Sequence, residues 1–202
     1  MKLTLAIFAI LSAIAAVAAV DIRGYSQHGC WGYYFVCHNI PSNACCNFPL
    51  KARSMRWTLP TGTRGIGQVR KHCSWNYPIV YGPRYSSCVN YNGLLGVRSG
   101  RWQQGICKWT FRRSVLLERQ DEVCQISEGC IDPDVFVYTT ETGANRTVTV
   151  DPGTAETVAK MAEAGDMKGM ANLTDFKGEL DTTPSVDLYD FEEPKEGDVE
   201  NE

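Results

Sequence analysis

Nine cysteines lie between residues 30 and 130 of a chain of 202 residues, and none lies outside this stretch. In an oxidising compartment so dense a group predicts disulfides rather than metal ligands. Cys45 and Cys46 are neighbours in the chain, and a bridge between neighbours strains the backbone, so we expect each to pair with a different partner. The pairing is otherwise open, and the set comprises Cys30, Cys37, Cys45, Cys46, Cys73, Cys88, Cys107, Cys124 and Cys130.

An odd number of cysteines leaves one of them unpaired within the chain. That cysteine is a buried thiol, a disulfide link to a second copy of the chain, or a consequence of processing. The sequence alone does not distinguish these three possibilities. A disulfide-linked dimer is therefore one of the partnerships that the sequence allows.

The N-terminus has the pattern of a secretory signal peptide. Lys2 precedes an apolar run from Leu3 to Val20, which ends in small residues around Ala19. A membrane anchor is the less favoured alternative, because the run is barely long enough to span a bilayer. We expect residues 1–19 to be a signal peptide, no later membrane span, and a secreted, extracellular protein.

Charge, tryptophan and cysteine all change near Ile131. Residues 21–130 hold all five Trp and carry 14 Lys and Arg against 5 Asp and Glu, whereas residues 131–202 carry 5 against 18. We call the first part the head, and we divide the second part into an extension and a tail. The predicted division is a basic cysteine-rich β domain (20–130), an acidic extension with a hairpin and a helix (131–174) and a disordered acidic tail (175–202).

The head has the sequence signals of short strands. Apolar and polar residues alternate from Ser54 to Leu59 and again from Cys107 to Phe111, which is typical of half-buried strands. Asn92 and Gly93 form a favoured two-residue hairpin turn, because both residues tolerate positive φ. Turn residues recur between these pieces. The predicted fold is mainly β, a small sandwich or barrel stapled by disulfides.

The extension predicts a hairpin followed by one short helix. Val135–Thr140 and Arg146–Val150 are β-favouring runs on either side of a loop that contains glycine. Asp151 followed by proline is a suitable helix start, and Gly165 is a suitable end. From about Asp175 onward the chain is acidic and poor in large apolar residues, which is typical of disorder.

Two sequence patterns in the extension match the acceptor for N-linked glycans. Asn145 and Asn172 are each followed two residues later by threonine. We expect at least one of them to carry a glycan in a secreted protein.

The histidines of the head are candidates for acid–base chemistry in a basic, aromatic setting. His28, His38 and His72 each lie within two residues of a cysteine. A pair of histidines can serve as acid and base on a phosphodiester, as in secreted ribonucleases. The simpler interpretation is that all three are polar loop residues beside disulfides. The cysteine spacings do not fit a zinc site, so we expect no metal and no cofactor.

Basic residues are spread through the head beside Trp and Tyr. Such a surface attracts anionic polysaccharide, nucleic acid or lipid headgroups. The alternative, which we favour, is that the tethered acidic tail neutralises the head. Removal of residues 175–202 should then strengthen adsorption to anionic polymers at low ionic strength. The basic residues concerned are Arg53, Arg56, Arg64, Arg70, Lys71, Arg84, Arg98 and Arg101.

The segment from Gly29 to Pro41, with the Cys45–Cys46 pair after it, resembles small cysteine-rich secreted proteins of filamentous fungi. These have an aromatic-flanked cysteine, a short loop with Asn and Pro, a Cys-Cys pair and a β-rich remainder. The resemblance covers about half of the chain. It implies an effector, a disulfide-stabilised protein released at a host or competitor surface, and it implies no catalytic residues.

The sequence as a whole favours a non-enzymatic, effector-like secreted protein that acts by binding in the extracellular space. Its ligand on a host or cell surface is not identified by the sequence. One alternative is a secreted ribonuclease that uses His38 and His72. The other is a basic antimicrobial or toxin head that the acidic tail holds inactive.

Overall fold

Strands make up most of the regular structure, so the prediction of a mainly β fold is confirmed. The computed structural model describes residues 19–73, 79–81, 88–91, 96–104 and 130–180. The predictions for residues 1–18, the Asn92–Gly93 turn, the strand at Cys107 and residues 181–202 lie outside the described residues. Within the described residues, no helix is both long and apolar enough to cross a bilayer.

Six strands form an antiparallel sheet, which we call sheet A. They are β1 (Val20–Tyr25), β2 (Tyr34–Ile40), β4 (Ser54–Trp57), β7 (Cys88–Asn90), β10 (Val135–Thr139) and β11 (Asn145–Thr149). The order across the sheet is β11-β10-β2-β1-β4-β7. The predicted hairpin of the extension is therefore present, and it continues the sheet of the head through the pairing of β10 with β2.

Five strands form the second sheet, sheet B. They are β3 (Cys45–Ala52), β5 (Thr63–Gln68), β6 (Ile79–Tyr81), β8 (Val97–Gln104) and β9 (Cys130–Ile131), in the order β6-β5-β8-β3-β9. Among the described strands, only β9 runs parallel to its neighbour, β3. The described connections include two single-turn 3-10 helices, η2 (His28–Cys30) and η3 (Lys71–Cys73).

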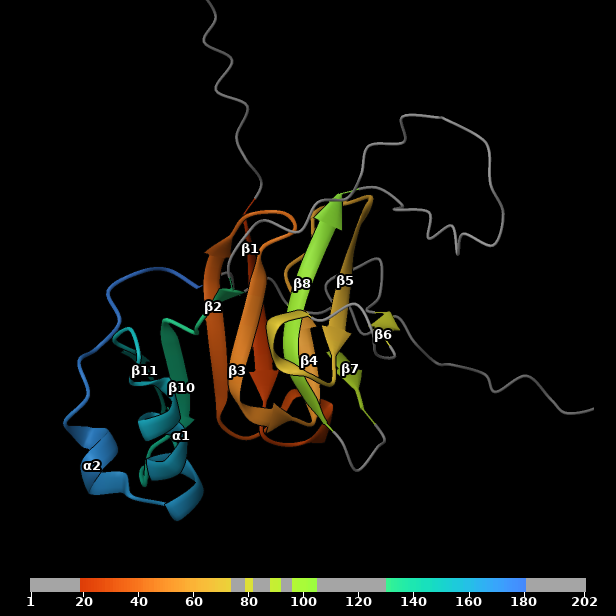
Figure 1. The fold of residues 1–202 in the computed structure, drawn as a ribbon. Coiled ribbons are helices and arrows are strands. Elements are labelled where there is room, and N and C mark those ends of the chain that lie inside the picture. The colour runs from red at the N-terminus through yellow and green to blue at the C-terminus, as the bar shows by residue number, and fades with distance from the viewer. Residues whose placement is uncertain (1–18, 74–78, 82–87, 92–95, 105–129, 181–202) are drawn as a thin grey trace, which may run out of the picture.

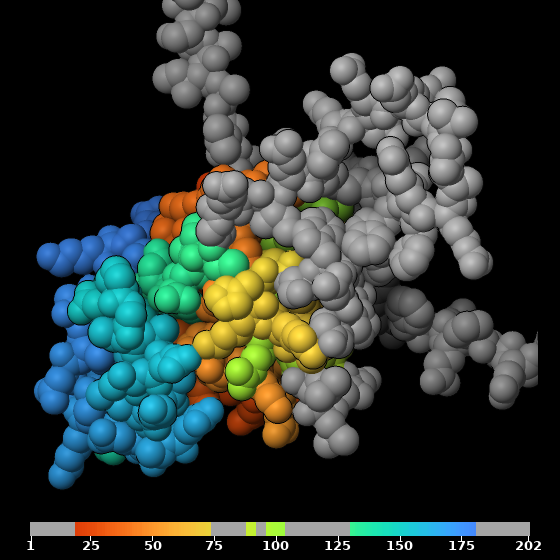
Figure 2. All heavy atoms as spheres, viewed as in Figure 1, coloured from red at the N-terminus to blue at the C-terminus, as the bar shows by residue number. Residues whose placement is uncertain are grey.

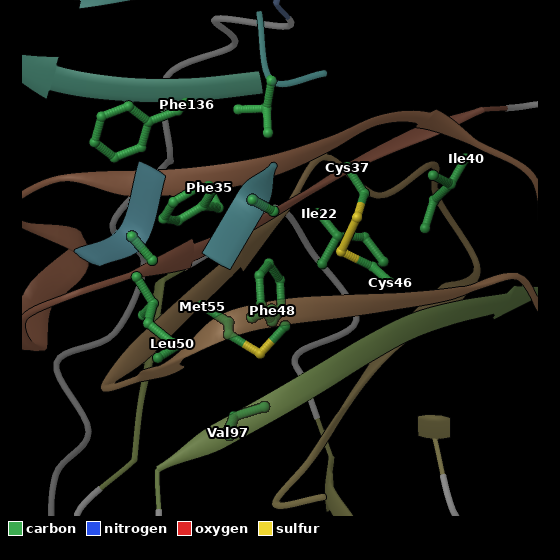
Figure 3. Close-up of a cluster of buried hydrophobic side chains, with 14 of the residues drawn as sticks. Ile22, Phe35, Cys37, Ile40, Cys46, Phe48, Leu50, Met55, Val97 and Phe136 are labelled. Atoms are coloured by element: carbon green, nitrogen blue, oxygen red, sulfur yellow. A yellow bond between two sulfur atoms is a disulfide. The ribbon is translucent and has the colours of Figure 1, made fainter. Parts of the chain in front are cut away.

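The two sheets pack face to face around one hydrophobic core (Figure 3). Ile22 and Phe35 of sheet A and Phe48 of sheet B are fully buried there. The Cys37–Cys46 disulfide crosses the same core from β2 to β3. A small disulfide-stapled sandwich is thus the observed architecture, as the alternating pattern and the cysteine cluster predicted.

Glycines make room for large side chains in this core. Met55 and Trp57 point inward from β4, as the alternation predicted, and both are fully buried. A Cβ on Gly65 would lie 2.7 Å from Cδ2 of Trp57, and one on Gly24 would lie 2.8 Å from Cδ1 of Phe48. Because interiors are close-packed, these positions have no space for a larger residue.

Helices α1 (Ala155–Ala164) and α2 (Met167–Ala171) follow the hairpin and lie beside it at one end of the molecule (Figure 1). Val158 and Ala159 of α1 are buried in the same core cluster as the sandwich. Figure 2 shows the cyan and blue residues of the extension packed against the orange and yellow residues of the head. The extension is therefore docked onto the sandwich.

The predicted start of α1 is wrong by three residues, whereas its predicted end is correct. Asp151 begins a tight turn before the helix, in which Thr154 donates to the Asp151 carbonyl from both its backbone nitrogen (3.0 Å) and its hydroxyl (2.7 Å). Gly153 adopts a φ of +79° in this turn. Thr154 is thus the N-cap, and Gly165 ends the helix with a φ of +67°.

Ordered contacts extend past Thr174 into the segment where the acidic tail was expected to begin. Phe176 donates its backbone N–H to the Thr147 carbonyl at 3.0 Å, so this segment lies along the free edge of β11. Arg146 of β11 organises the approach: its guanidinium bonds Asp175 at 2.8 Å and also bonds the Leu173 carbonyl at 2.8 Å.

Candidate binding groove

Three disulfides join described residues of the head. They join Cys30 to Cys88, Cys37 to Cys46 and Cys45 to Cys73. The expectation that Cys45 and Cys46 pair with different partners is confirmed.

Cys130 has no disulfide partner among the described residues, and the remaining candidates, Cys107 and Cys124, lie outside them. The backbone of Cys130 lies opposite that of Cys45 where strands β3 and β9 pair in parallel. Burial raises the pKa of the Cys130 thiol, which makes its thiolate scarce at neutral pH. The predicted link between two chains through the odd cysteine stays a prediction.

A large open groove lies between the head and the extension. Its volume is about 910 Å³, within the range of about 300–1,000 Å³ that is usual for small-molecule sites. Four elements form its walls: β3, the start of β8, the loop around η2 and helix α1. The lining residues are Ser26, His28, Tyr33, Pro49, Leu50, Lys51, Arg53, Gly96, Arg98, Glu156, Ala159, Lys160 and Glu163.

Cations outnumber carboxylates in this groove. Lys51, Arg53 and Arg98 come from the head and Lys160 comes from α1. None of these four side chains forms an ion pair with another described residue. Four basic groups therefore face one cavity with two carboxylates among them, although the whole chain has a formal net charge of -3.

One of the two carboxylates already has a partner. Glu156 of α1 accepts a hydrogen bond from the Lys71 ammonium at 2.8 Å. This bond, and the charges of Lys71, Lys160 and Arg98, lower the pKa of Glu156. On the same helix, Glu163 lies near Tyr33, whose pKa is raised by partial burial and then by the Glu163 charge. The acidic extension thus neutralises part of the basic head but leaves the groove with an excess of cations.

His38, a candidate ribonuclease residue, is held by a buried carboxylate. Its Nδ1 lies 2.8 Å from Oδ1 of Asp21, and its Nε2 lies 2.7 Å from Nδ2 of Asn39. The ring of Phe176 lies edge-on to the imidazole, with 5.5 Å between the two ring centroids. Both ring nitrogens thus have protein partners.

His72 has different surroundings. Its backbone N–H donates to Oδ1 of Asn47 at 2.7 Å, and its Nδ1 lies 3.3 Å from Nδ2 of the same amide. It precedes Cys73 of the Cys45–Cys73 bridge and has a φ of +66°. The imidazole of His38 bonds Asp21 and Asn39, whereas that of His72 bonds Asn47, and of the three histidines only His28 lines the groove. Among the described residues, no group of three or more His, Cys, Asp or Glu is placed to hold a metal.

The basic residues singled out from the sequence divide into several environments. Arg53 and Arg98 line the groove, and Lys71 binds Glu156. Arg101 is instead 1% exposed, and burial lowers its pKa to about 10. Arg84 lies outside the described residues. A list of basic residues in the sequence therefore does not amount to one surface.

Both glycan acceptors are exposed, as the sequence predicted for surface sites. Asn145 opens β11, and its Oδ1 accepts a hydrogen bond from the Thr139 hydroxyl at 3.1 Å. Its Nδ2, the atom that a glycan would modify, is not used in that bond. Asn172 lies just after α2 as its C-cap.

A family model described as an N-terminal domain, ARB_05566_N, matches residues 21–134. The chain belongs to this family. The ARB_05566_N match covers β1 through β9 and ends at Asp134, immediately before β10. No curated protein and no solved structure matches the chain. Within the groove, β3, β8 and the η2 loop come from the ARB_05566_N domain, and α1 comes from the segment that follows it.

Sequence reasoning missed several groove residues. Lys51 and Lys160 were not singled out, and neither was Tyr33. They lie far apart in the chain and share no local motif. The one available signal was the amphipathic pattern of α1. It predicts that one face of the helix is buried, but it does not identify β3 as the element on which that face packs.

Proposed function

We propose that this is a secreted, non-enzymatic, effector-like protein that binds an anionic ligand in the groove between β3 and α1. The observation that carries the proposal is the set of four cations, Lys51, Arg53, Arg98 and Lys160, without ion-pair partners among the described residues. Unpaired cations that converge on one cavity produce a positive potential that attracts and orients anions.

The location at a host or competitor surface belongs to this proposal as well. Disulfides persist in oxidising, extracellular environments, and the three described bridges support such a location. The N-terminal sequence, with its basic start and apolar run, supports export. The resemblance to fungal secreted proteins supports an effector role.

The two alternatives have less support. A ribonuclease needs two groups that act on opposite sides of one phosphodiester, and neither His38 nor His72 lines the groove where the cations converge. A toxin head inhibited by its acidic tail (175–202) has only indirect support, the Lys71–Glu156 contact, because Glu156 belongs to the extension and not to the tail. That contact occupies Lys71 and leaves the four groove cations available.

Retention on a heparin-type resin, eluted by a salt gradient, tests the proposal. A protein with a net charge of -3 has no overall attraction to the resin, so retention reports a local basic site. The variant Arg53→Gln with Arg98→Gln should elute at lower salt than the wild type. The matched control, Lys168→Gln with Lys177→Gln, loses the same two charges outside the groove and should elute with the wild type.

Equal shifts of both double variants would mean that overall charge rather than the groove causes retention, and would overturn the proposal. A second arm incubates the wild-type protein with RNA. Hydrolysis that is abolished by His38→Ala or His72→Ala would establish the ribonuclease instead.

A further inference from the structure

Trp31 is exposed in a way that is unusual for its size. It is 73% exposed, whereas Trp57 and Trp102 are fully buried. Large aromatic side chains dominate the energy of binding sites when they lie on a rigid support, because little conformational entropy is lost on contact. The contribution of Trp31 to binding therefore depends on how rigidly its loop is held.

The loop that carries Trp31 is fixed by several independent contacts. Cys30 is bridged to Cys88 of β7, and its backbone N–H donates to Oγ of Ser54 at 2.9 Å. The backbone N–H of Gly29 donates to Oδ1 of Asn90 at 2.6 Å. These contacts hold Cys30 at a φ of +57°, in the left-handed region that a residue with a side chain rarely adopts.

The position of the indole follows from this backbone. A Cβ on Gly29 would lie 2.9 Å from Cδ1 of Trp31, so the ring packs over the bare backbone of Gly29. Gly29 and Gly32 have φ of +72° and +78°. Glycine adopts these angles without strain, but Cys30 does not, and non-glycine residues held in this region cluster at functional sites.

The same loop forms one wall of the groove. Ser26, His28 and Tyr33 line the cavity on either side of Trp31 in the chain. Two backbone hydrogen bonds close the loop, from Ser26 to the Tyr33 carbonyl at 3.0 Å and from Gln27 to the Trp31 carbonyl at 3.3 Å. Residues on both sides of Trp31 in the chain therefore line the groove, and a ligand that extends past this wall would lie beside the loop that presents the indole.

The groove also restricts the chemistry of that ligand. Its cations suit carboxylate or sulfate groups, and Glu163 is an acceptor that suits hydroxyl groups. A nucleic acid carries a charge at every nucleotide, but its sugar keeps at most one free hydroxyl, so it offers few sugar hydroxyls to Glu163. A chain of sugar rings that carry both acidic groups and hydroxyls fits this mixture of cations and acceptor better.

We propose that the groove binds an acidic oligosaccharide, with the indole of Trp31 stacked on a sugar ring next to the ring whose acidic group meets Arg53 and Arg98. This inference rests on the proposed function, because it assigns the ligand class of the same groove. It adds a residue, Trp31, whose contribution does not depend on charge.

The test is a titration of the full secreted chain with three probes: a heparin-derived tetrasaccharide, inorganic polyphosphate and single-stranded oligothymidylate. Trp31→Ala should weaken tetrasaccharide binding by about ten-fold or more and leave polyphosphate binding unchanged. Trp31→Phe should retain most of the tetrasaccharide affinity, because it keeps an aromatic face. Unchanged thermal unfolding of both variants establishes that the loop still folds.

The possible failures are distinguishable. Tetrasaccharide affinity that is equal in the wild type and Trp31→Ala overturns this inference but leaves the anion groove in place, provided that polyphosphate binding depends on Arg53 and Arg98. Tighter binding of the oligothymidylate than of the tetrasaccharide overturns the ligand class. Absence of binding to all three probes overturns the proposed function itself.

Discussion

The ammonium of Lys71 lies 2.8 Å from a carboxylate oxygen of Glu156, a contact between the head and helix α1 across 85 residues of sequence. Lys71 opens η3, which is covalently tied to β3 by the Cys45–Cys73 bridge. Glu156 lies in the first turn of α1, where the helix dipole also favours a negative charge. This ion pair therefore links the head to the start of the helix that forms one wall of the groove.

Loss of the Glu156 charge should loosen α1. Because the folded state lowers the pKa of Glu156 below its usual 4.5, its contribution to stability is fully present above pH 4.5 and is lost as the pH falls through the lowered value. Amide exchange of α1 in the wild type, corrected for intrinsic rates, should accelerate in that acidic window. Glu156→Gln should show faster exchange of α1 already at pH 7, whereas the control Glu163→Gln should not. Equal protection of α1 in the wild type and both variants would contradict a stabilising role of the Lys71–Glu156 pair.

The Cys37–Cys46 bridge should contribute strongly to stability. The two residues are 9 apart in sequence, and closing so short a loop stabilises the native state by about 2–3 kcal/mol in the chain-entropy model. Both cysteines are also fully buried, so their loss removes apolar contacts as well. Urea unfolding of Cys37→Ala should show a loss of about 3 kcal/mol. The double variant with Cys46→Ala should lose little more, and additive losses would mean that the pair is not bridged.

Arg146→Lys should detach the segment after α2 from β11. Arginine holds Asp175 and several backbone carbonyls through one planar fork, and lysine cannot reproduce that geometry. The substitution keeps the charge and also keeps the glycan acceptor at Asn145. Hydrogen exchange of the Phe176 amide should accelerate, whereas Lys168→Arg, a matched exchange on α2, should leave it unchanged. Full protection of Phe176 in Arg146→Lys would contradict the assigned role.

Asn145 and Asn172 should carry glycans when the protein is secreted from eukaryotic cells. Both side chains are exposed and precede the required threonine by two residues. Treatment with an endoglycosidase should lower the mass of the wild type, and Asn145→Gln and Asn172→Gln should each remove one glycan. Identical masses for the wild type and both variants would show that neither acceptor is used.

Local patterns predicted some elements of this fold, whereas strands such as β1, β3 and β8 and the second helix, α2, were not predicted. The alternation after Ser54 predicted β4, and the turn residues around Gly143 predicted the β10–β11 hairpin. The adjacent pair Cys45–Cys46 predicted two separate bridges, because adjacent cysteines cannot easily pair with one another. In each case the signal and the structure lie within a few residues of one another.

Long-range pairing could not be predicted in this way. Val135 of β10 lies opposite Val36 of β2, about a hundred positions earlier, and no periodicity in either strand specifies that partner. The docking of Ala159 against the core depends on the same arrangement. The groove exists only after both contacts have formed, so its lining residues could be found from the structure alone.

The most direct test of the anion groove is to locate a bound ligand by hydrogen exchange. Addition of a heparin-derived oligosaccharide to the full secreted chain should protect amides in three separate segments, residues 26–33, 49–53 and 156–163. Each of these segments contributes residues to the groove. Protection confined to another surface, or no protection at concentrations that saturate retention on the resin, would contradict the account.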